Sequence, residues 1–310
     1  MKKRRIKKSV IRNFALAIIL IICLSIFIKT QKYHKTNEYK LKQIGYKKEE
    51  IALIEKEPKE NIEYILQNEY NDSIDDIINE KYYLNKNLQK YIDYKNNNQN
   101  EKLSDIIAII NTHADQEEYK NPNNTDIDKK ELMLVNKYNH LDENYKPENI
   151  EKISPRYAYD ENYAPKEIIE EYKKMFEAAQ EAGIELVISS SYRSYEEQEE
   201  TYDFYKQIKG DDVKNYASLP GYSEHQTGLA FDILKIGVLT DDFDKTDEFK
   251  WLIDNSYKYG FILRYPKGKE NITKFDYESW HYRYVGQEAA RIIHDENITF
   301  EEYYAYYIEK

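Results

Sequence analysis

The stretch PGYSEHQTGLAFD, residues 220–232, decides how the second half of this chain folds. Its Pro-Gly pair predicts a tight turn. The apolar run GLAFDIL, residues 228–234, begins in this stretch and predicts a β-strand. His225 therefore falls on a loop, whereas Asp232 projects from the strand that follows. Gly228 lies between them and lets the chain bend sharply. The stretch thus predicts that an imidazole and a carboxylate face the same space.

Helical and strand patterns alternate on both sides of this stretch. Helices are predicted at residues 166–182, 195–209, 246–259 and 286–296. Apolar and β-branched runs predict further strands at residues 184–192, 261–265 and 280–285. Because successive strands lie close enough along the chain to pair as hairpins, we expect an α+β domain over residues 131–310. Its sheet should be mainly antiparallel and flanked by helices.

The segment ESWHYRY, residues 278–284, completes the side chains that hydrolysis by zinc requires. A catalytic zinc takes three protein ligands and keeps a fourth position for water. It lowers the pKa of that water to about 7, and a separate carboxylate must move the proton. We predict His225, Asp232 and His281 as the ligands of one Zn²⁺ per chain. Glu278, three residues before His281, is the predicted general base.

Other metal arrangements are excluded by what the chain contains. Its one cysteine, Cys23, allows neither an intrachain disulfide nor a zinc site built from thiolates. No HExxH motif is present, so the two imidazoles do not come from one helix. Any metal must therefore be held by histidines and carboxylates from separate segments.

Three ordered motifs resemble those of the VanY-like D-alanyl-D-alanine carboxypeptidases. This family shares a fold core with lysostaphin-type peptidases and hedgehog domains. The central motif SxHxxGxAxD is followed by ExWH and preceded by SxYRSxxxQ, and the resemblance covers about residues 131–296. The matching residues are Ser190, Tyr192, Arg193, Ser194, Gln198, Ser223, His225, Gly228, Ala230, Asp232, Glu278, Trp280 and His281.

The resemblance implies roles for the residues around the metal. Arg193 would bind the free C-terminal carboxylate of a peptide, because a guanidinium fork suits a planar carboxylate. Gln198 and Ser223 would hydrogen-bond the peptide end, and Tyr192 and Trp280 would form walls of the pocket. The implied activity is removal of the last D-Ala from peptidoglycan stem peptides.

Four alternatives to this activity differ in substrate or in class. An L,D-carboxypeptidase acting on the tetrapeptide stem is the first, because relatives with the same metal motif have that activity. A D,D-dipeptidase is the second, but such an enzyme acts on free dipeptide and needs no membrane anchor. A wall-lysing endopeptidase is the third, and it is disfavoured by Arg193 and by the N-terminal anchor described below. A non-catalytic wall-binding protein is expected to lose some of the metal and base residues, and all four are present here.

The N-terminus predicts a membrane anchor. Residues 1–12 hold seven cations and no acid, and residues 14–28 carry no charge. A basic flank before an apolar run keeps the N-terminus in the cytoplasm. We expect residues 1–29 to be an uncleaved signal anchor, with the rest of the chain outside the membrane; a cleaved signal peptide is the alternative.

The segment between the anchor and the α+β domain predicts short amphipathic helices. Apolar residues recur at helical spacing through residues 30–120, and helix starts are expected near Ser73 and Ser104. We expect a helical spacer or a wall-associated module, closed by a polar loop at residues 114–129. With +7 in residues 1–12, the rest of the chain carries −11 − 7 = −18, which argues against nucleic acid as a partner.

Overall fold

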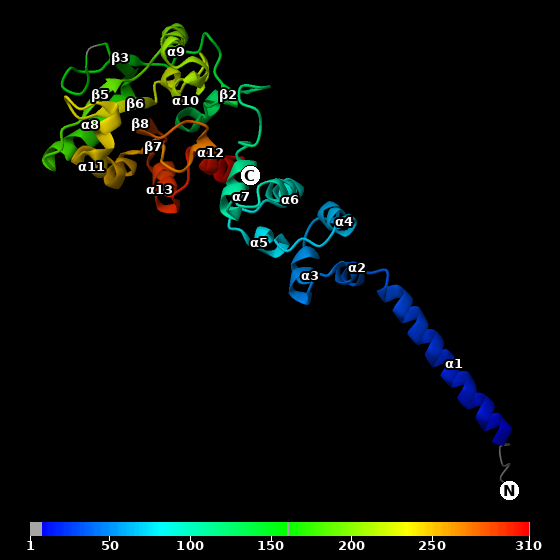
Figure 1. Cartoon of the computed structure of the whole chain (residues 1–310). Coiled ribbons are helices and arrows are strands. Elements are labelled where there is room, and N and C mark those ends of the chain that lie inside the picture. The colour runs from blue at the N-terminus through cyan, green and yellow to red at the C-terminus, as the bar shows by residue number, and fades with distance from the viewer. Residues whose placement is uncertain (1–7, 160, 310) are drawn as a thin grey trace. The chain divides into compact units, whose positions relative to one another are not determined.

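The computed structural model describes residues 8–159 and 161–309 and divides into two compact units, Met1–Ile107 and Ala108–Lys310. The basic residues at positions 2–7, which belong to the predicted signal anchor, lie outside the described residues. Figure 1 shows the helical first unit and the mixed second unit.

The first unit begins with one long helix, α1 (Lys8–Tyr33). Its segment Arg12–Tyr33 has 22 residues and a mean hydropathy of 2.3, and its apolar side chains are exposed. A bilayer core requires about 20 predominantly apolar residues. The helix therefore meets the length and composition of a membrane span, and a signal sequence meets them equally.

Six short helices follow α1. They are α2 (Asn37–Ile44), α3 (Lys48–Ile54), α4 (Lys59–Gln67), α5 (Ile74–Asn79), α6 (Leu88–Asn97) and α7 (Leu103–Asn111), of which α7 crosses the boundary between the units. Their buried residues fall at the helical spacing seen in the sequence, with Leu41, Ile54 and Ile77 fully enclosed. The expected start at Ser73 is the residue before α5, whereas Ser104 lies inside α7, which begins at Leu103.

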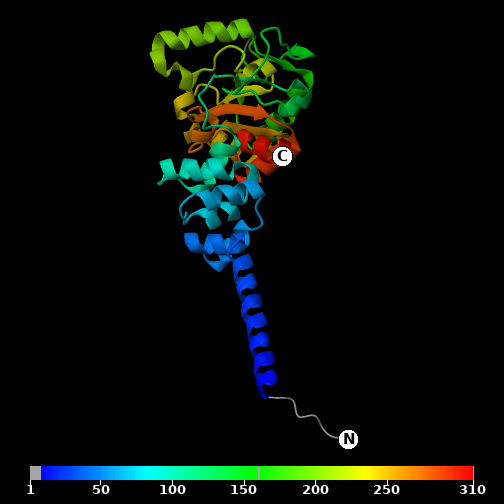
Figure 2. The same ribbon diagram turned by 90° about the vertical axis from the view of Figure 1, so that its right-hand side faces the viewer.

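The second unit is a mixed α and β structure. Its helices are α8 (Lys166–Glu181), α9 (Tyr195–Lys209), α10 (Val213–Tyr216), α11 (Asp247–Asn255), α12 (Glu270–Thr273), α13 (Gln287–Glu296) and α14 (Phe300–Tyr303). Its strands are β1 (Asn123–Asn124), β2 (Asn139–His140), β3 (Ile150–Lys152), β4 (Tyr163–Pro165), β5 (Val187–Ser190), β6 (Ala230–Leu234), β7 (Phe261–Tyr265) and β8 (Glu278–Tyr284). Figure 2 shows α9 at one end of this unit, away from the sheet strands.

Most predicted elements of the second unit are confirmed, and the differences are local. The predicted helix at 246–259 ends as α11 at Asn255 and continues as a 3₁₀ turn. The predicted strand at 184–192 is shorter, because pairing is limited to Val187–Ser190. The predicted loop at 114–129 contains β1, which pairs in parallel with β2.

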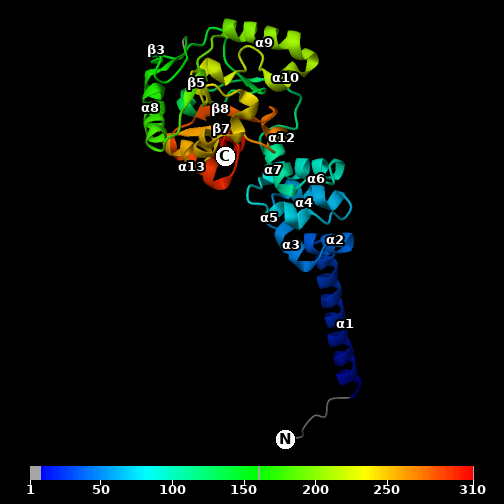
Figure 3. The same cartoon turned by 60° about the vertical axis from the view of Figure 1, so that its left-hand side comes forward.

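The central sheet has the order β5-β6-β8-β7, with every neighbouring pair antiparallel. Alternation along β6 sends Phe231 and Ile233 to one face, where Tyr172 of α8 packs edge-on against Phe231 at 5.7 Å between ring centroids. Figure 3 shows α8 lying along the sheet. Asp232, between these two apolar residues, therefore projects from the opposite face.

The register of β6 and β8 places two polar side chains together. Asp232 pairs directly with His281, and directly opposed residues have side chains on the same face. The pairing of β7 with β8 is irregular: Leu263 pairs with Tyr282, but Tyr265 pairs with Glu278. An unbroken register would pair Tyr265 with Trp280, so β8 bulges by two residues here. The bulge brings Glu278 toward His281, although a regular strand points residues three apart to opposite faces.

Gly228 is needed where the chain passes from the His225 turn into β6. Its φ is +71°, and a Cβ there would lie 2.7 Å from Cδ of Pro165 and 3.2 Å from Cγ of Pro147. We predict that Gly228→Ala lowers the free energy of unfolding by about 2–4 kcal/mol, from backbone strain and overpacking against rigid rings.

Gly268→Ala is the matched control, because Gly268 has φ +83° but open space around it. It should lose only about 1 kcal/mol, from backbone strain alone. Urea unfolding followed by tryptophan fluorescence measures this unit specifically, because Trp251 and Trp280 are the only tryptophans of the chain. Equal losses in the two variants would contradict the packing argument.

Candidate active site

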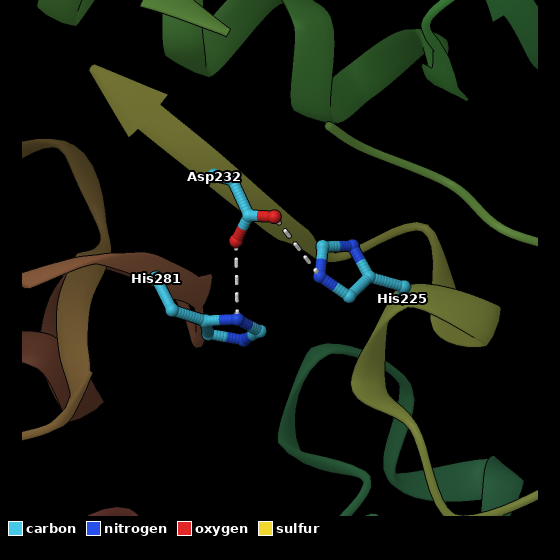
Figure 4. A group of neighbouring side chains, drawn as sticks. All are labelled: His225, Asp232 and His281. Atoms are coloured by element: carbon cyan, nitrogen blue, oxygen red, sulfur yellow. Dashed lines mark ion pairs between the residues drawn. The ribbon is translucent and has the colours of Figure 1, made fainter. Parts of the chain in front are cut away.

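Three side chains from separate elements converge on the face of the sheet opposite to the one that packs against α8. Asp232 comes from β6, His281 from β8 and His225 from the 3₁₀ turn Glu224–Thr227 before β6. Figure 4 shows the Asp232 carboxylate between the two imidazoles. Asp232 Oδ2 lies 3.6 Å from His225 Nε2, and Oδ1 lies 3.3 Å from His281 Nδ1. One ligand atom of each residue lies within 4.8 Å of the other two.

This cluster fits a tetrahedral zinc. Ligand atoms about 2.0–2.1 Å from one zinc ion are separated by roughly 3.4 Å. Each imidazole nitrogen lies near that distance from one oxygen of the Asp232 carboxylate, at 3.6 Å and 3.3 Å. Asp232 Oδ1 is a buried carboxylate oxygen without a hydrogen-bond partner among the described residues. A buried anionic oxygen is costly unless a cation or a donor meets it. The residues present therefore suit a divalent cation with nitrogen and oxygen ligands.

Each imidazole is held by its other ring nitrogen. His225 Nδ1 lies 2.6 Å from the carbonyl oxygen of Ser191, so Nδ1 donates its proton there and Nε2 is left with its lone pair toward Asp232. His281 Nε2 faces Glu224 Oε2 at 3.6 Å, which is ion-pair range but longer than a hydrogen bond. His281 therefore presents Nδ1 to the cluster.

Glu224 belongs to a buried and balanced group of charges behind His281. Its Oε1 accepts from Arg264 Nε at 2.7 Å and lies 3.0 Å from Arg283 Nη1. Arg264 Nη1 also donates to Glu301 Oε2 of α14 at 2.8 Å. All four side chains are buried, and two positive charges match two negative ones. Such a group is stable only while every partner is present, because an unpaired buried charge is costly.

The electrostatics of the site follow from this burial. Burial opposes the charge of Glu224, but Arg264 and Arg283 outweigh it and hold the pKa of that carboxyl well below its usual range. Burial also opposes the charge of His281, but the carboxylates of Asp232 and Glu224 on either side of the ring raise the pKa of His281 to about 9. His281 thus holds a proton near pH 7 in the metal-free protein, and a metal must displace it.

Glu278 lies beside the three clustered side chains but is not one of them. Its Oε2 is 3.5 Å from His281 Nδ1, and its side chain is 13% exposed. Burial raises the pKa of Glu278 to about 8, against the opposing effect of His281. A carboxylate with a raised pKa at the edge of a metal cluster has the affinity for protons that a general acid–base requires.

Arg193 is fixed at the same cavity. Its backbone N–H donates to the carbonyl oxygen of His225 at 3.2 Å. Its guanidinium donates to Gln198 Oε1 at 2.8 Å and to Ser190 Oγ at 3.0 Å, while Gln198 Nε2 donates to the carbonyl oxygen of Ser218. The Gln198 amide is thus used at both ends to orient Arg193.

One cavity of about 270 Å³ joins these residues. The lining includes the three side chains of the His225–Asp232–His281 group, and also Glu278, Arg193, Trp280 and Ser223. Ser223 is buried and accepts the backbone N–H of His225, which caps the turn. Tyr192, predicted as a pocket wall, lines the adjoining groove along Ser189–Arg193 and is not among the residues around this cavity.

The charged residues behind His281 and part of the cavity wall were not predicted from the sequence. Tyr205 of α9, Tyr216 of α10 and Tyr265 of β7 line the cavity. The sequence does contain an indication of Arg264 and Arg283, because each lies within an apolar stretch predicted to be a strand. A fully buried arginine needs a carboxylate partner.

Comparisons with known proteins agree with this geometry. The family model for VanY, D-alanyl-D-alanine carboxypeptidase, matches residues 161–287, which include every predicted site residue. A putative carboxypeptidase, YodJ, of Bacillus subtilis is 45% identical over 181 residues. That match covers 56% of this chain and 66% of YodJ, so the chain spans just under two thirds of that relative.

Two further relatives match this chain over nearly all of their own length. VanXYC of Enterococcus gallinarum, a bifunctional D-Ala-D-Ala dipeptidase and D-Ala-D-Ala carboxypeptidase, is 32% identical over 56% of this chain and 94% of its own length. The solved structure of the LdcB LD-carboxypeptidase has a TM-score of 0.56 and 42% identity. It covers 60% of this chain and 91% of the LdcB chain.

The fold and the site together define a metal-dependent peptidase domain. Two imidazoles and a carboxylate meet on one sheet face, with a second carboxylate and a guanidinium at the same cavity. This chain belongs to the VanY D-alanyl-D-alanine carboxypeptidase family.

We predict that Glu224 sets the metal affinity through His281. Glu224→Gln keeps the size of the side chain but removes the negative charge that faces His281 Nε2. Zinc affinity should fall by about 10–100-fold, as for other partners of ligating histidines. Competition with a chromophoric chelator measures this affinity.

Glu301→Gln is the control. It removes the other anionic partner of Arg264 and leaves His281 and its neighbours in place. The free energy of unfolding should fall in both variants, but zinc affinity should fall only in Glu224→Gln. Equal zinc affinities in Glu224→Gln and the parent would limit Glu224 to a role in stability.

Proposed function

We propose that this chain is a zinc-dependent D-alanyl-D-alanine carboxypeptidase that removes the C-terminal D-Ala from peptidoglycan stem peptides. One observation carries the proposal. A proton acceptor, Glu278, and a carboxylate receptor, Arg193, line the same cavity as the His225–Asp232–His281 cluster. A peptide held by its last carboxylate thereby presents its last peptide bond to the groups that hydrolyse it.

The proposed chemistry assigns each residue one task. His225, Asp232 and His281 would hold the zinc. When bound, zinc would supply the Lewis acidity that polarises the scissile carbonyl and activates water. Glu278 accepts a proton from the attacking water and delivers it to the nitrogen of the leaving D-Ala. Arg193 binds the terminal carboxylate, so only the last bond of a peptide reaches Glu278.

Removal of D-Ala from the tetrapeptide stem is the second candidate activity. The similarity to the LdcB LD-carboxypeptidase favours it. The two activities differ in the configuration of the residue before the cleaved bond, whereas the metal, the base and the carboxylate receptor serve both. A purely wall-binding role does not require a base with a raised pKa beside a complete ligand set.

Digestion of purified muropeptides decides between these activities. The full chain, loaded with zinc in detergent, is incubated with pentapeptide and tetrapeptide muropeptides, and the products are identified by mass. We expect loss of one D-Ala from the pentapeptide. Cleavage of the tetrapeptide alone would establish the L,D activity, and no cleavage of either would contradict both.

The location of this activity is also a proposal. The apolar α1 and the basic residues before it support an anchored protein with a cytoplasmic N-terminus and an extracytoplasmic catalytic unit. That topology places the cavity on the side of the membrane where peptidoglycan stem peptides are found. Residues 30–120 would then lie between the membrane and the catalytic unit as a spacer or wall-associated module.

We predict that Glu278→Ala keeps zinc and loses turnover. The variant removes the proton acceptor, so kcat should fall by about 10²–10⁴-fold. Zinc content, measured by atomic absorption, should match the parent, because three ligands remain. His281→Ala is the comparison, and it should lose zinc and activity together. Loss of zinc from Glu278→Ala would make Glu278 a ligand and leave the base unassigned.

We predict that Arg193→Ala affects binding of the peptide end. Without the guanidinium, KM for a peptide with a free C-terminus should rise strongly, with a smaller change in kcat. The preference for a free over an amidated C-terminus should weaken, because no charge remains to select the carboxylate. The measurement uses one synthetic peptide in both forms. An unchanged preference would show that another residue binds the carboxylate.

A further inference from the structure

The short helices α2 to α6 of the first unit pack on one another in a stack. α2 packs on α3 and α4, α3 packs on α5, and both α4 and α5 pack on α6. Figure 3 shows these helices one after another along the chain. Part of the pattern repeats with a spacing of 24 residues, seen in Leu41 with Ile65 and in Tyr46 with Tyr70. Stacked helical repeats of this kind create an extended surface between neighbouring repeats.

A groove lies along this stack, wholly within the first unit. Its volume is about 420 Å³, in the range of binding sites for small ligands. The residues that are buried in it are apolar or aromatic: Tyr46, Ile65, Ile74 and Ile92. The more exposed lining residues are Tyr64, Asn68, Glu69, Tyr70, Asn71, Asp93 and Asn96.

The two accessible tyrosine rings are held in place by carboxylates. Tyr70 Oη donates to Glu50 Oε1 at 3.0 Å, and Tyr64 Oη donates to Asp93 Oδ1 at 2.9 Å. Tyr70 also packs against Tyr46, with 4.9 Å between ring centroids, and its side chain is 41% exposed. A rigid, partly exposed ring offers contact area at little cost in conformational entropy.

Side-chain amides supply the polar contacts of the groove. Asn68 Nδ2 donates to the carbonyl oxygen of Tyr64, and Asn71 Oδ1 accepts from the Ser73 N–H. Each bond fixes one end of an amide and leaves the other end for a ligand. An amide can donate to or accept from hydroxyl and acetamido groups.

The charge of the groove excludes anionic ligands. Its eleven lining residues include Glu69 and Asp93 and no lysine or arginine. A phosphate polymer or an acidic peptide requires cations, which are absent from this lining. The part of the ligand that enters the groove therefore carries no negative charge, and neutral amides are available for its polar contacts.

We propose that this groove binds the glycan strand of the cell wall, a chain of neutral N-acetylated sugars. A sugar ring has an apolar C–H face that suits the rings of Tyr64 and Tyr70. Its hydroxyl and acetamido groups suit the amides of Asn68, Asn71 and Asn96. The choice of a wall glycan rests on the proposed function, because that substrate is attached to the wall. The groove would hold the glycan, and the catalytic unit would act on the stem peptides.

The test uses the full chain in detergent and chitohexaose, six β-1,4-linked N-acetylglucosamine units without a peptide. The catalytic cavity is built for peptide ends, so this probe reports on the groove. Isothermal titration should show saturable binding by the parent. Tyr70→Ala should weaken binding at least about tenfold, as loss of a central aromatic contact does elsewhere. Tyr70→Phe keeps the ring and should stay within about threefold of the parent.

Two variants guard against indirect effects. Tyr82→Ala removes a tyrosine of the same unit that does not line the groove, and its affinity should equal that of the parent. Asn96→Ala removes an exposed amide that does line the groove and should weaken binding even if Tyr70→Ala fails to fold. Cleavage of muropeptides should be unchanged in all four variants, so a failure of the proposed activity is seen separately from a failure of glycan binding.

Three outcomes would overturn the proposal. The first is no binding of chitohexaose by the parent. The second is binding that neither Tyr70→Ala nor Asn96→Ala weakens, which would place the sugar elsewhere on the chain. The third is displacement of the probe by a sugar-free stem peptide or by poly(glycerol phosphate), which would make the groove a peptide or polyanion site.

Discussion

The direct pairing of Asp232 with His281 across β6 and β8 is the constraint on which the site depends. It fixes a carboxylate and an imidazole on one sheet face, while the neighbouring Phe231 and Tyr282 pack into the core on the other. A shift of one residue in either strand would exchange these faces, burying the ligands and exposing the aromatic rings. The packing of the apolar core and the convergence of the three polar side chains therefore require the same register.

The charges behind the cluster extend this constraint to the C-terminus of the chain. Glu224 precedes His225 and faces His281, the two predicted histidine ligands, and Arg264 connects it to Glu301 of α14. Each member is buried, so the free energy of each ion pair depends on the others. Helix α14 thereby contributes to the stability of the charged group behind His281, although it lies outside the residues matched by the family model.

The two units differ in how they would bind a polymer of the wall. The catalytic unit presents charged groups with defined directions, which suit one peptide end and one bond. The first unit presents held tyrosine rings and amides without cations, which suit a repeated and neutral surface. A weak contact to the glycan would raise the local concentration of stem peptides without competing for the catalytic cavity.

The sequence alone determined the class of domain and its main helices and strands, and it singled out His225, Asp232 and His281, which the structure brings together. These follow from local patterns, because apolar periodicity and short motifs are carried by neighbouring residues. The tertiary structure decided the rest. The two-residue bulge in β8, the pairing of Glu224 with Arg264 and Arg283, and the bond from Gln198 to Ser218 all depend on contacts between separate segments. The 24-residue spacing in the first unit became visible only when stacked helices showed which positions are equivalent. Such contacts depend on register and packing between elements, which no single stretch of sequence encodes.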